Sequence, residues 1–289
     1  MDLNLAEIQP PDWDFEAWLT ENGQVFTAFR EQDSSCVSYG WIWRGQRLFV
    51  KYSREGRGIA SLRRAEKVYK TVQHPALPRL HAVLEMPAAL ALVLDWLPGE
   101  NLYDYTKLRG VEARSNPSSP HARFRAQPSQ HIQAALATIY DTHLELAAHG
   151  FIAVDFYDGC ILYDFDQDST HLCDLDEYRL GAFTLNAERL PGSRRFMAPE
   201  EWQRDAIIDQ VTNVYTLGRA ALIFLVSGGR TPVGWKGTPA QLHVAIRATA
   251  DERNQRFPSV AAFVEAWQEA GSDPPISPTA GFKNPNLPG

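Results

Sequence analysis

Four aspartates in two short segments are the residues of this 289-residue chain best suited to chemistry. Asp155 and Asp158 lie in FIAVDFYDGCILYDF, and Asp174 and Asp176 lie in LCDLDEY. A carboxylate at a strand end suits hard Mg²⁺, which prefers oxygen ligands, and a carboxylate can also accept the proton of a substrate hydroxyl. Lys51 ends the apolar stretch RLFVK. Taken alone, these residues are equally compatible with turns and solvated strand ends.

Composition restricts the classes of partner. The chain is 44% hydrophobic and has a net charge of −7, which argues against nucleic acid as the main partner because such a partner requires a basic face. The three cysteines show no CxxC spacing and indicate neither a disulfide framework nor a zinc site. The N-terminus lacks the apolar core of a signal peptide, and the longest apolar run, AALIFLV, is too short to cross a bilayer. We expect a cytoplasmic protein without a membrane segment.

The elements that must position these residues change in type along the chain. Three β-type segments lie within 24–52, and residues 59–73 have an apolar helical face that ends before His74-Pro75. Two more strands are predicted near LHAVLE and ALVLDW. After Pro98-Gly99 the prediction is mostly helical, with two short strands in CILYDF and THLCDL. The helices are expected at 130–148, 199–205, 210–227, 239–249 and 258–270, with a short one in NLYDYTKL.

We therefore predict an α+β protein with a small β-rich lobe and a larger helical lobe. The expected boundaries are 24–97 for the first lobe and 98–270 for the second. Residues 1–23 form an N-terminal extension with a short helix. Residues 110–129, rich in Pro, Ser and Arg, are expected to be an exposed insertion, and residues 271–289 a disordered tail.

Several spaced motifs resemble the protein kinase superfamily, in particular bacterial Ser/Thr kinases of the eukaryotic-like type. GSRRFMAPEE is similar to the end of a kinase activation segment, NVYTLGRAALIFLVSG to the central helix, and ERNQRFPSVAAFVEAW to the last helices. The resemblance covers roughly residues 25–270 and implies the two-lobed protein-kinase-like fold. It also implies that Arg256 pairs with Glu200. Asn213 stands where the family has an Asp that supports the catalytic loop.

The resemblance also implies roles for site residues, with ATP and Mg²⁺ as cofactors. Asp155 would position the substrate hydroxyl, Lys51 would hold the phosphates, and Glu66 would orient Lys51, although the family spacing falls on Ala65. Asp174 and Asp176 would hold Mg²⁺. The residues expected at the nucleotide, besides Lys51, are Ser34, Ser35, Val37, Asp95, Leu97, Asn101 and Leu162.

Some positions depart from the family pattern. The expected phosphate loop has no glycine before Gly40, and Tyr157 and Cys160 replace a Lys and a metal-binding Asn. Asp158 or Asp176 could replace the Asn oxygen, and Arg194 or Arg195 could supply a charge.

The expected function is an ATP-dependent kinase acting on Ser or Thr of a protein substrate, with its input from a regulatory partner. Two alternatives stay open: a pseudokinase that acts as a nucleotide-binding or scaffold module, and a small-molecule kinase of the aminoglycoside or choline type. We also expect activity to be independent of Thr184, with Phe183, Leu185 and Leu190 holding the activation segment by packing.

Overall fold

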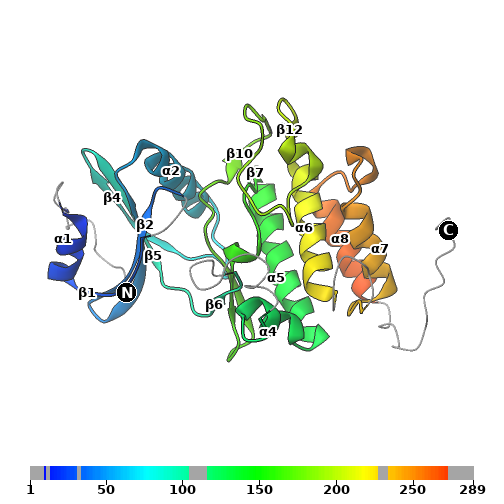
Figure 1. Ribbon diagram of the computed structural model, residues 1–289, viewed down its shortest axis with the longest axis horizontal. Coiled ribbons are helices and arrows are strands. Elements are labelled where there is room, and N and C mark those ends of the chain that lie inside the picture. The colour runs from blue at the N-terminus through cyan, green and yellow to red at the C-terminus, as the bar shows by residue number, and fades with distance from the viewer. Residues whose placement is uncertain (1–9, 11–13, 31–33, 104–115, 227–233, 273–289) are drawn as a thin grey trace.

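The computed structural model describes residues 10, 14–30, 34–103, 116–226 and 234–272. Its N-terminal part is built on an antiparallel five-stranded sheet in the spatial order β1-β2-β3-β5-β4. Figure 1 shows this sheet at one end of the molecule and the helices α5, α6, α7 and α8 at the other. The arrangement is compatible with the two-lobed fold. The strands are β1 (Gln24–Phe29), β2 (Val37–Trp43), β3 (Gln46–Ser53), β4 (Leu80–Met86) and β5 (Ala89–Asp95).

The two faces of β3 serve different purposes. Side chains alternate along a strand, so Leu48 and Val50 pack into the cluster beneath α1 (Phe15–Asn22). Phe49 instead packs against the larger core, which includes α2 (Gly56–Thr71). This alternation directs Lys51 toward the interior between the two parts of the molecule rather than toward α1.

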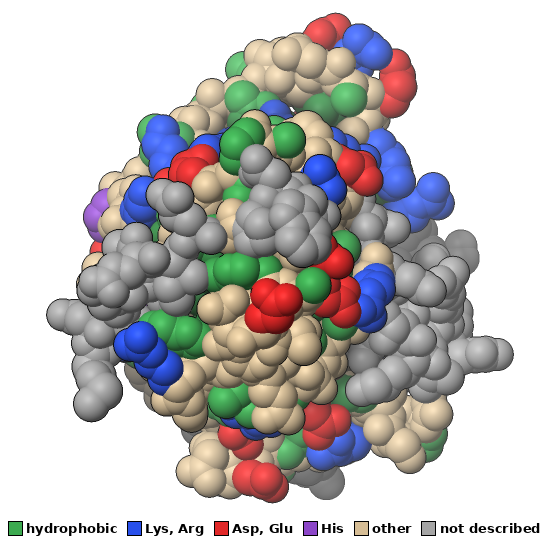
Figure 2. Space-filling view, turned by 90° about the vertical axis from the view of Figure 1, so that its left-hand side faces the viewer, with side chains coloured by type: hydrophobic (Ala, Val, Ile, Leu, Met, Phe, Trp, Pro, Cys, Tyr) green, Lys and Arg blue, Asp and Glu red, His purple; other side chains and the backbone are tan. Residues whose placement is uncertain are grey.

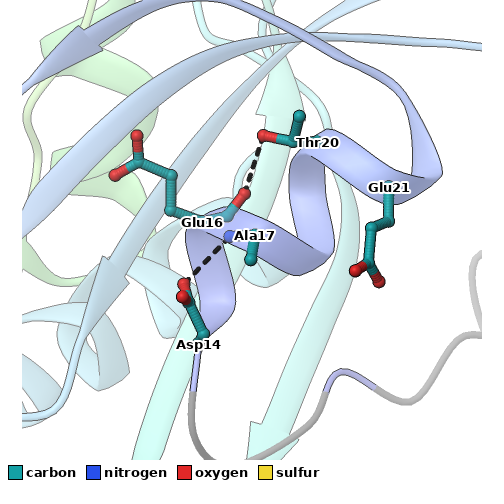
Figure 3. A pocket seen from close by; sticks show the side chains of 5 residues that line it. All are labelled: Asp14, Glu16, Ala17, Thr20 and Glu21. Atoms are coloured by element: carbon teal, nitrogen blue, oxygen red, sulfur yellow. Dashed lines mark hydrogen bonds between the residues drawn. The ribbon is translucent and has the colours of Figure 1, made fainter.

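Helix α1 covers the outer face of the sheet. Its Phe15, Trp18 and Leu19 are buried, and the indole of Trp41 donates a hydrogen bond to the Leu19 carbonyl at 2.8 Å. Figure 2, which looks onto this end of the molecule, shows acidic side chains gathered near its centre. Figure 3 shows a surface hollow on α1, where Asp14 caps the helix by accepting from the Ala17 N–H at 2.9 Å. Asp14 thus has a local role as the helix cap, on the side of the sheet opposite to Lys51.

The C-terminal part packs helices around α5 and α6. Tyr140 of α5, which is buried, contacts the rings of Phe263 and Trp267 on α8. The helices are α5 (Ser129–Ala148), α6 (Gln210–Leu225), α7 (Pro239–Ala248) and α8 (Val260–Gly271). The short strands are β6 (Glu100–Asn101), β7 (Phe151–Ile152), β8 (Ile161–Asp164), β9 (Ser169–Leu172), β10 (Arg179–Leu180), β11 (Phe183–Thr184) and β12 (Ile207–Ile208). The five strands of the sheet and the helices α2, α5, α6, α7 and α8 follow the predicted order with shifted bounds, and the helix predicted at 59–73 is α2. The helix predicted at 199–205 is wrong, because that stretch holds only the short 3-10 helix η3 (Pro199–Trp202). The short strands β6, β7 and β10 to β12 were not predicted.

The expected exposed insertion at 110–129 needs correction. Within it, α4 (Pro120–Ala126) buries Phe124 and His121 completely or nearly so. Ser119 caps the helix by accepting from the Ala122 N–H at 3.2 Å, and Pro120 occupies its first turn, where the missing N–H has no cost. The short helix expected in NLYDYTKL falls mainly outside the described residues. The tail expected from residue 271 begins later than predicted, because Gly271 is still in α8, and residues 273–289 lie outside the described residues. Among the helices that the structure describes, none is long and apolar enough to cross a membrane.

Candidate active site

Lys51 meets two aspartates that are distant in sequence. Its Nζ lies 2.6 Å from Asp174 Oδ1 and also forms an ion pair with Asp176 Oδ2. Burial alone would lower the pKa of Lys51, but the charges of Asp174 and Asp176 together raise it well above its usual range. Burial raises the pKa of Asp176 and Lys51 opposes this; because the two groups are in direct contact, the ionised pair is favoured. The structure thus brings together three of the residues predicted for the site.

The expected partner of Lys51 on the helix is corrected by the structure. Glu66 pairs instead with Arg63 at 2.9 Å and with Lys70 at 2.6 Å, and Ala65 is fully buried in the core. One residue along a helix turns the side chain by about 100°. That rotation is enough to place Glu66 on the outer side of α2, because Ala65 faces inward.

Asp155 lies in a loop that is held by its backbone. The side chain of Asn213 on α6 accepts from the Ala153 N–H at 2.8 Å and donates to the Ala153 carbonyl at 2.7 Å. Support from the central helix is thus retained with an amide in place of a carboxylate. Asp155 has φ 63° and Asp174 has φ 61°, a left-handed conformation uncommon for residues other than glycine and frequent at functional sites.

The surroundings of Asp155 change its acidity. Burial, followed by the negative charge of Asp174, raises the pKa of Asp155 to about 7. A small hollow beside Asp155 includes Gly192, Glu201 and Thr216 in its wall. A Cβ added to Gly192 would lie 3.6 Å from Asp155 Oδ1, an ordinary van der Waals distance, so it is the φ of 140° at Gly192 that favours glycine here. A carboxyl group with a pKa near neutrality can act as a general base at ordinary pH.

Neither Tyr157 nor Cys160 is suited to bind a metal ion or a phosphate group. The Cys160 thiol is fully buried and donates to the Asp155 carbonyl at 3.2 Å. Burial raises its pKa well above the usual value, which keeps it in the thiol form, a poor ligand for Mg²⁺. The ring of Tyr157 lies over Gly159, where an added Cβ would come within 2.4 Å of a ring carbon. Tyr157 therefore shapes the loop and brings no positive charge.

Asp158 and Arg195 are also unavailable for the roles expected of them. Asp158 Oδ2 accepts from Arg195 at 2.7 Å and lies 3.0 Å from His121 Nδ1. Both the aspartate and the histidine are about 1% exposed. The guanidinium of Arg194 lies over the Trp202 ring. Asp158 thus joins α4, the loop of Asp155 and the segment of Arg195 in one cluster, which leaves its carboxylate unavailable to a metal ion.

Several residues expected at the nucleotide form hydrogen bonds within the polypeptide. Asp95 Oδ1 lies 2.6 Å from His81 Nε2. The backbone N–H of Asp95 donates to the Arg79 carbonyl at 3.0 Å. Asn101 donates to the Gly159 carbonyl at 2.6 Å, and its Oδ1 accepts from the Tyr103 N–H. The Ser35 carbonyl accepts from Ser53 Oγ at 2.6 Å. Ser34, Val37, Leu97 and Leu162 are all partly exposed, so they can face a ligand.

The segment that contains Phe183, Leu185 and Leu190 is held by apolar packing, as expected. Leu185 and Leu190 are buried in one cluster with Ile152, Val154 and Met197, and Phe183 packs against it. Thr184 is exposed on β11.

The Glu200–Arg256 pair is confirmed as well. Arg256 donates to both carboxylate oxygens of Glu200, at 2.7 and 3.0 Å. This buried pair joins the end of the activation segment to the segment that precedes α8.

The donor set fits one hard cation better than two. Within the described residues, no group of three or more His, Cys, Asp or Glu could hold a metal ion. This is compatible with Mg²⁺, which is usually bound by one or two carboxylates together with substrate phosphates and water. The Asp174 side chain is 46% exposed and suits that role. The buried thiol of Cys160 does not fit a second metal site.

Sequence reasoning missed the groups that tie α2 to the site. Arg64 donates to the Asp176 carbonyl at 2.8 Å and to Glu177 at 2.6 Å, and Ser61 donates to the same Glu177 oxygen at 2.9 Å. Ser61 and Arg64 are three apart on one helical face, which was the available signal. His121 was missed too, although Ser119-Pro120 is a helix-start pattern.

Comparison with known proteins gives one distant relative. The chain is 27% identical over 229 residues to calcium-dependent protein kinase 9 of Oryza sativa subsp. japonica. The match covers 77% of this chain but only 36% of the length of the rice protein. No family model matches the chain. The similarity supports a general relationship to protein kinases.

Proposed function

We propose that this chain is an ATP- and Mg²⁺-dependent kinase that transfers the γ-phosphoryl group to a Ser or Thr hydroxyl of a protein. The observation that carries the proposal is the contact of Lys51 with Asp174, 123 residues later, beside the partly buried Asp155. This places a fixed cation, a half-exposed carboxylate and a base of raised pKa in one region. The similarity to a protein kinase agrees with it.

Each residue has a role that its environment supports. Lys51 would bind phosphate oxygens and orient the nucleotide. Asp174 would hold Mg²⁺, which neutralises the charge of the transferring group when bound. Asp155 would accept the proton of the substrate hydroxyl. The hydroxyl oxygen would then bond to the γ-phosphorus while the bond between the γ-phosphorus and the bridging β-phosphate oxygen breaks, which releases ADP. Phe183, Leu185 and Leu190 would hold the activation segment that must accommodate the substrate.

The test is transfer of radiolabelled γ-phosphate from ATP to the protein itself or to a generic basic protein. We expect Asp155→Asn to lower the rate by about 10²–10⁴. The matched control is Asp166→Asn on an exposed loop, which should transfer like the wild type. Equal labelling by wild type and Asp155→Asn would refute the assignment.

A second candidate function is a nucleotide-binding module that transfers nothing. The observation in its favour is that Cys160, where the resemblance expects a metal-binding Asn, is fully buried and donates to the Asp155 carbonyl, so it offers no oxygen to a second metal ion. Thermal-shift titrations with ATP, with and without Mg²⁺, separate the two functions. Tight metal-independent binding without transfer supports the module. The small-molecule kinase has less support, because Asp176 of its motif is paired with Lys51.

A further inference from the structure

Asp176 is a buried carboxylate at the centre of the candidate site. Its side chain is 6% exposed, compared with 46% for Asp174. Its Oδ2 contacts the ammonium of Lys51, and its backbone carbonyl accepts from Arg64 Nε at 2.8 Å. The residue is therefore fixed at both its side chain and its main chain.

Helix α2 offers no carboxylate to Lys51. Leu62 and Ala65, on its inner face, are completely buried. Glu66 is held on the outer side by Arg63 and Lys70. The helix is instead joined to the segment after Asp176, since Ser61 and Arg64 both donate to Glu177 Oε1.

Burial argues against Asp176 as a metal ligand. Mg²⁺ demands octahedral oxygen coordination and usually keeps several waters. A carboxylate that is almost fully enclosed and already in contact with an ammonium cannot easily face a hydrated ion. The half-exposed carboxylate of Asp174 can. An ammonium has three donors, so Lys51 can hold both aspartates and still donate to a phosphate oxygen.

We propose that Asp176 is the positioning residue that orients Lys51 for phosphate binding, and that it does so in place of a carboxylate on α2. This inference rests on the proposed function. Helix α2 is then docked by the Ser61, Arg64 and Glu177 contacts, so its position does not depend on an ion pair with Lys51. The metal is left to Asp174.

The first experiment measures unfolding in urea and does not depend on nucleotide. It compares the full-length wild type, Lys51→Met, Asp176→Asn and the double variant. We expect Asp176→Asn to destabilise the wild type. In the Lys51→Met background it should be neutral or stabilising, because it removes a buried charge that has lost its partner. Additive effects of the two substitutions would overturn the pairing.

The second experiment measures ATP affinity and phosphate transfer across a Mg²⁺ titration. Asp176→Asn should weaken ATP binding about tenfold both without Mg²⁺ and at saturating Mg²⁺, and should add little to Lys51→Met. Asp174→Asn is the comparison variant: because Asp174 also accepts from Lys51, some loss is expected without Mg²⁺, but its loss should grow as Mg²⁺ is raised, whereas that of Asp176→Asn should not. Recovery of Asp176→Asn at high Mg²⁺ would identify a metal ligand and overturn the proposal. A wild type that shows the unfolding coupling but neither binds ATP nor transfers phosphate would refute the proposed function, and with it the positioning role.

Discussion

Replacing Arg256 by methionine removes one partner of a buried ion pair. The Arg256 side chain is 0% exposed and Glu200 is 5% exposed. Besides its two bonds to Glu200, Arg256 donates to the Ala250 carbonyl at 2.7 Å and to Asp251 at 3.0 Å. Methionine fills a similar space but leaves these acceptors without their donor. Breaking a buried pair by removing one partner costs about 3–5 kcal/mol.

The neighbouring Arg253 moderates this loss. It donates to Glu200 Oε1 at 2.6 Å and to Asp209 at 2.7 Å, so a positive charge stays beside Glu200 in the variant. We therefore expect the lower end of the range, about 3 kcal/mol of unfolding free energy. At about 2–4 °C per kcal/mol for a domain of this size, Tm should fall by roughly 6–12 °C. Urea unfolding and calorimetry measure the two quantities.

The pH dependence gives an independent check on the cause. Burial alone would raise the pKa of Glu200, but its hydrogen bonds, those from Arg256 first, bring it below the usual 4.5. A lowered folded pKa gives stability that is present above the unfolded value and is lost as pH falls through the folded value. The difference between wild type and Arg256→Met should therefore shrink in acid.

Arg253→Met is the control for the magnitude. Its side chain is 32% exposed, so we expect a loss of about 1 kcal/mol. The reasoning fails if Arg256→Met lies within about 1 kcal/mol of the wild type, or if Arg253→Met is the more damaging change.

Three further predictions concern other parts of the site. Burial raises the pKa of Glu201 to about 8 from its usual 4.5, so its neutral form contributes stability below the unfolded pKa that is lost as pH rises toward the folded value. Glu201→Gln should match the wild type near pH ~4 and exceed it by about 1 kcal/mol or more at pH ~9 in urea unfolding; equal stability at both would contradict this. Because the pKa of Asp155 is raised to about 7, kcat/KM of the proposed transfer should fall as pH drops below about 7 and the base becomes protonated; a flat profile down to pH ~5 would exclude this role. Thr184→Ala should keep transfer and stability near wild type, whereas Leu190→Ala should cost about 2–4 kcal/mol of stability; a rate loss above about tenfold for Thr184→Ala would show that its hydroxyl matters.

The order of elements was accessible from local sequence. Side-chain periodicity predicts the strands of the sheet and the helices α5 to α8, because a half-buried strand and an amphipathic helix need apolar residues at different intervals. His74-Pro75 and Pro98-Gly99 mark boundaries through backbone sterics. The spaced motifs also predict that Lys51 and Asp174 belong to one site.

Helix α4 was not predicted, and the reason is the composition of its segment. Pro, Ser and Arg dominate the segment that contains it, which favours a loop prediction, yet Phe124 is 0% exposed. Burial depends on what lies opposite, here Phe224 of α6 and Tyr163 of β8, and both are distant in the sequence. The segment itself carries only the cap at Ser119-Pro120 as a signal.

The sequence by itself determined which residues could do chemistry: the lysine at a strand end, the aspartates after short strands, and the absence of Lys and Asn in the catalytic loop. Only the tertiary structure decided how they pair. In the folded chain Lys51 forms an ion pair with Asp176 and not with Glu66. Asp158 contacts His121 and Arg195, and the Cys160 thiol donates to the Asp155 carbonyl. The physical reason is that an ion pair needs contact within a few ångströms. Whether two groups come that close depends on which face of α2 a residue occupies and on a segment more than a hundred residues away. Neither can be recognised in the local sequence.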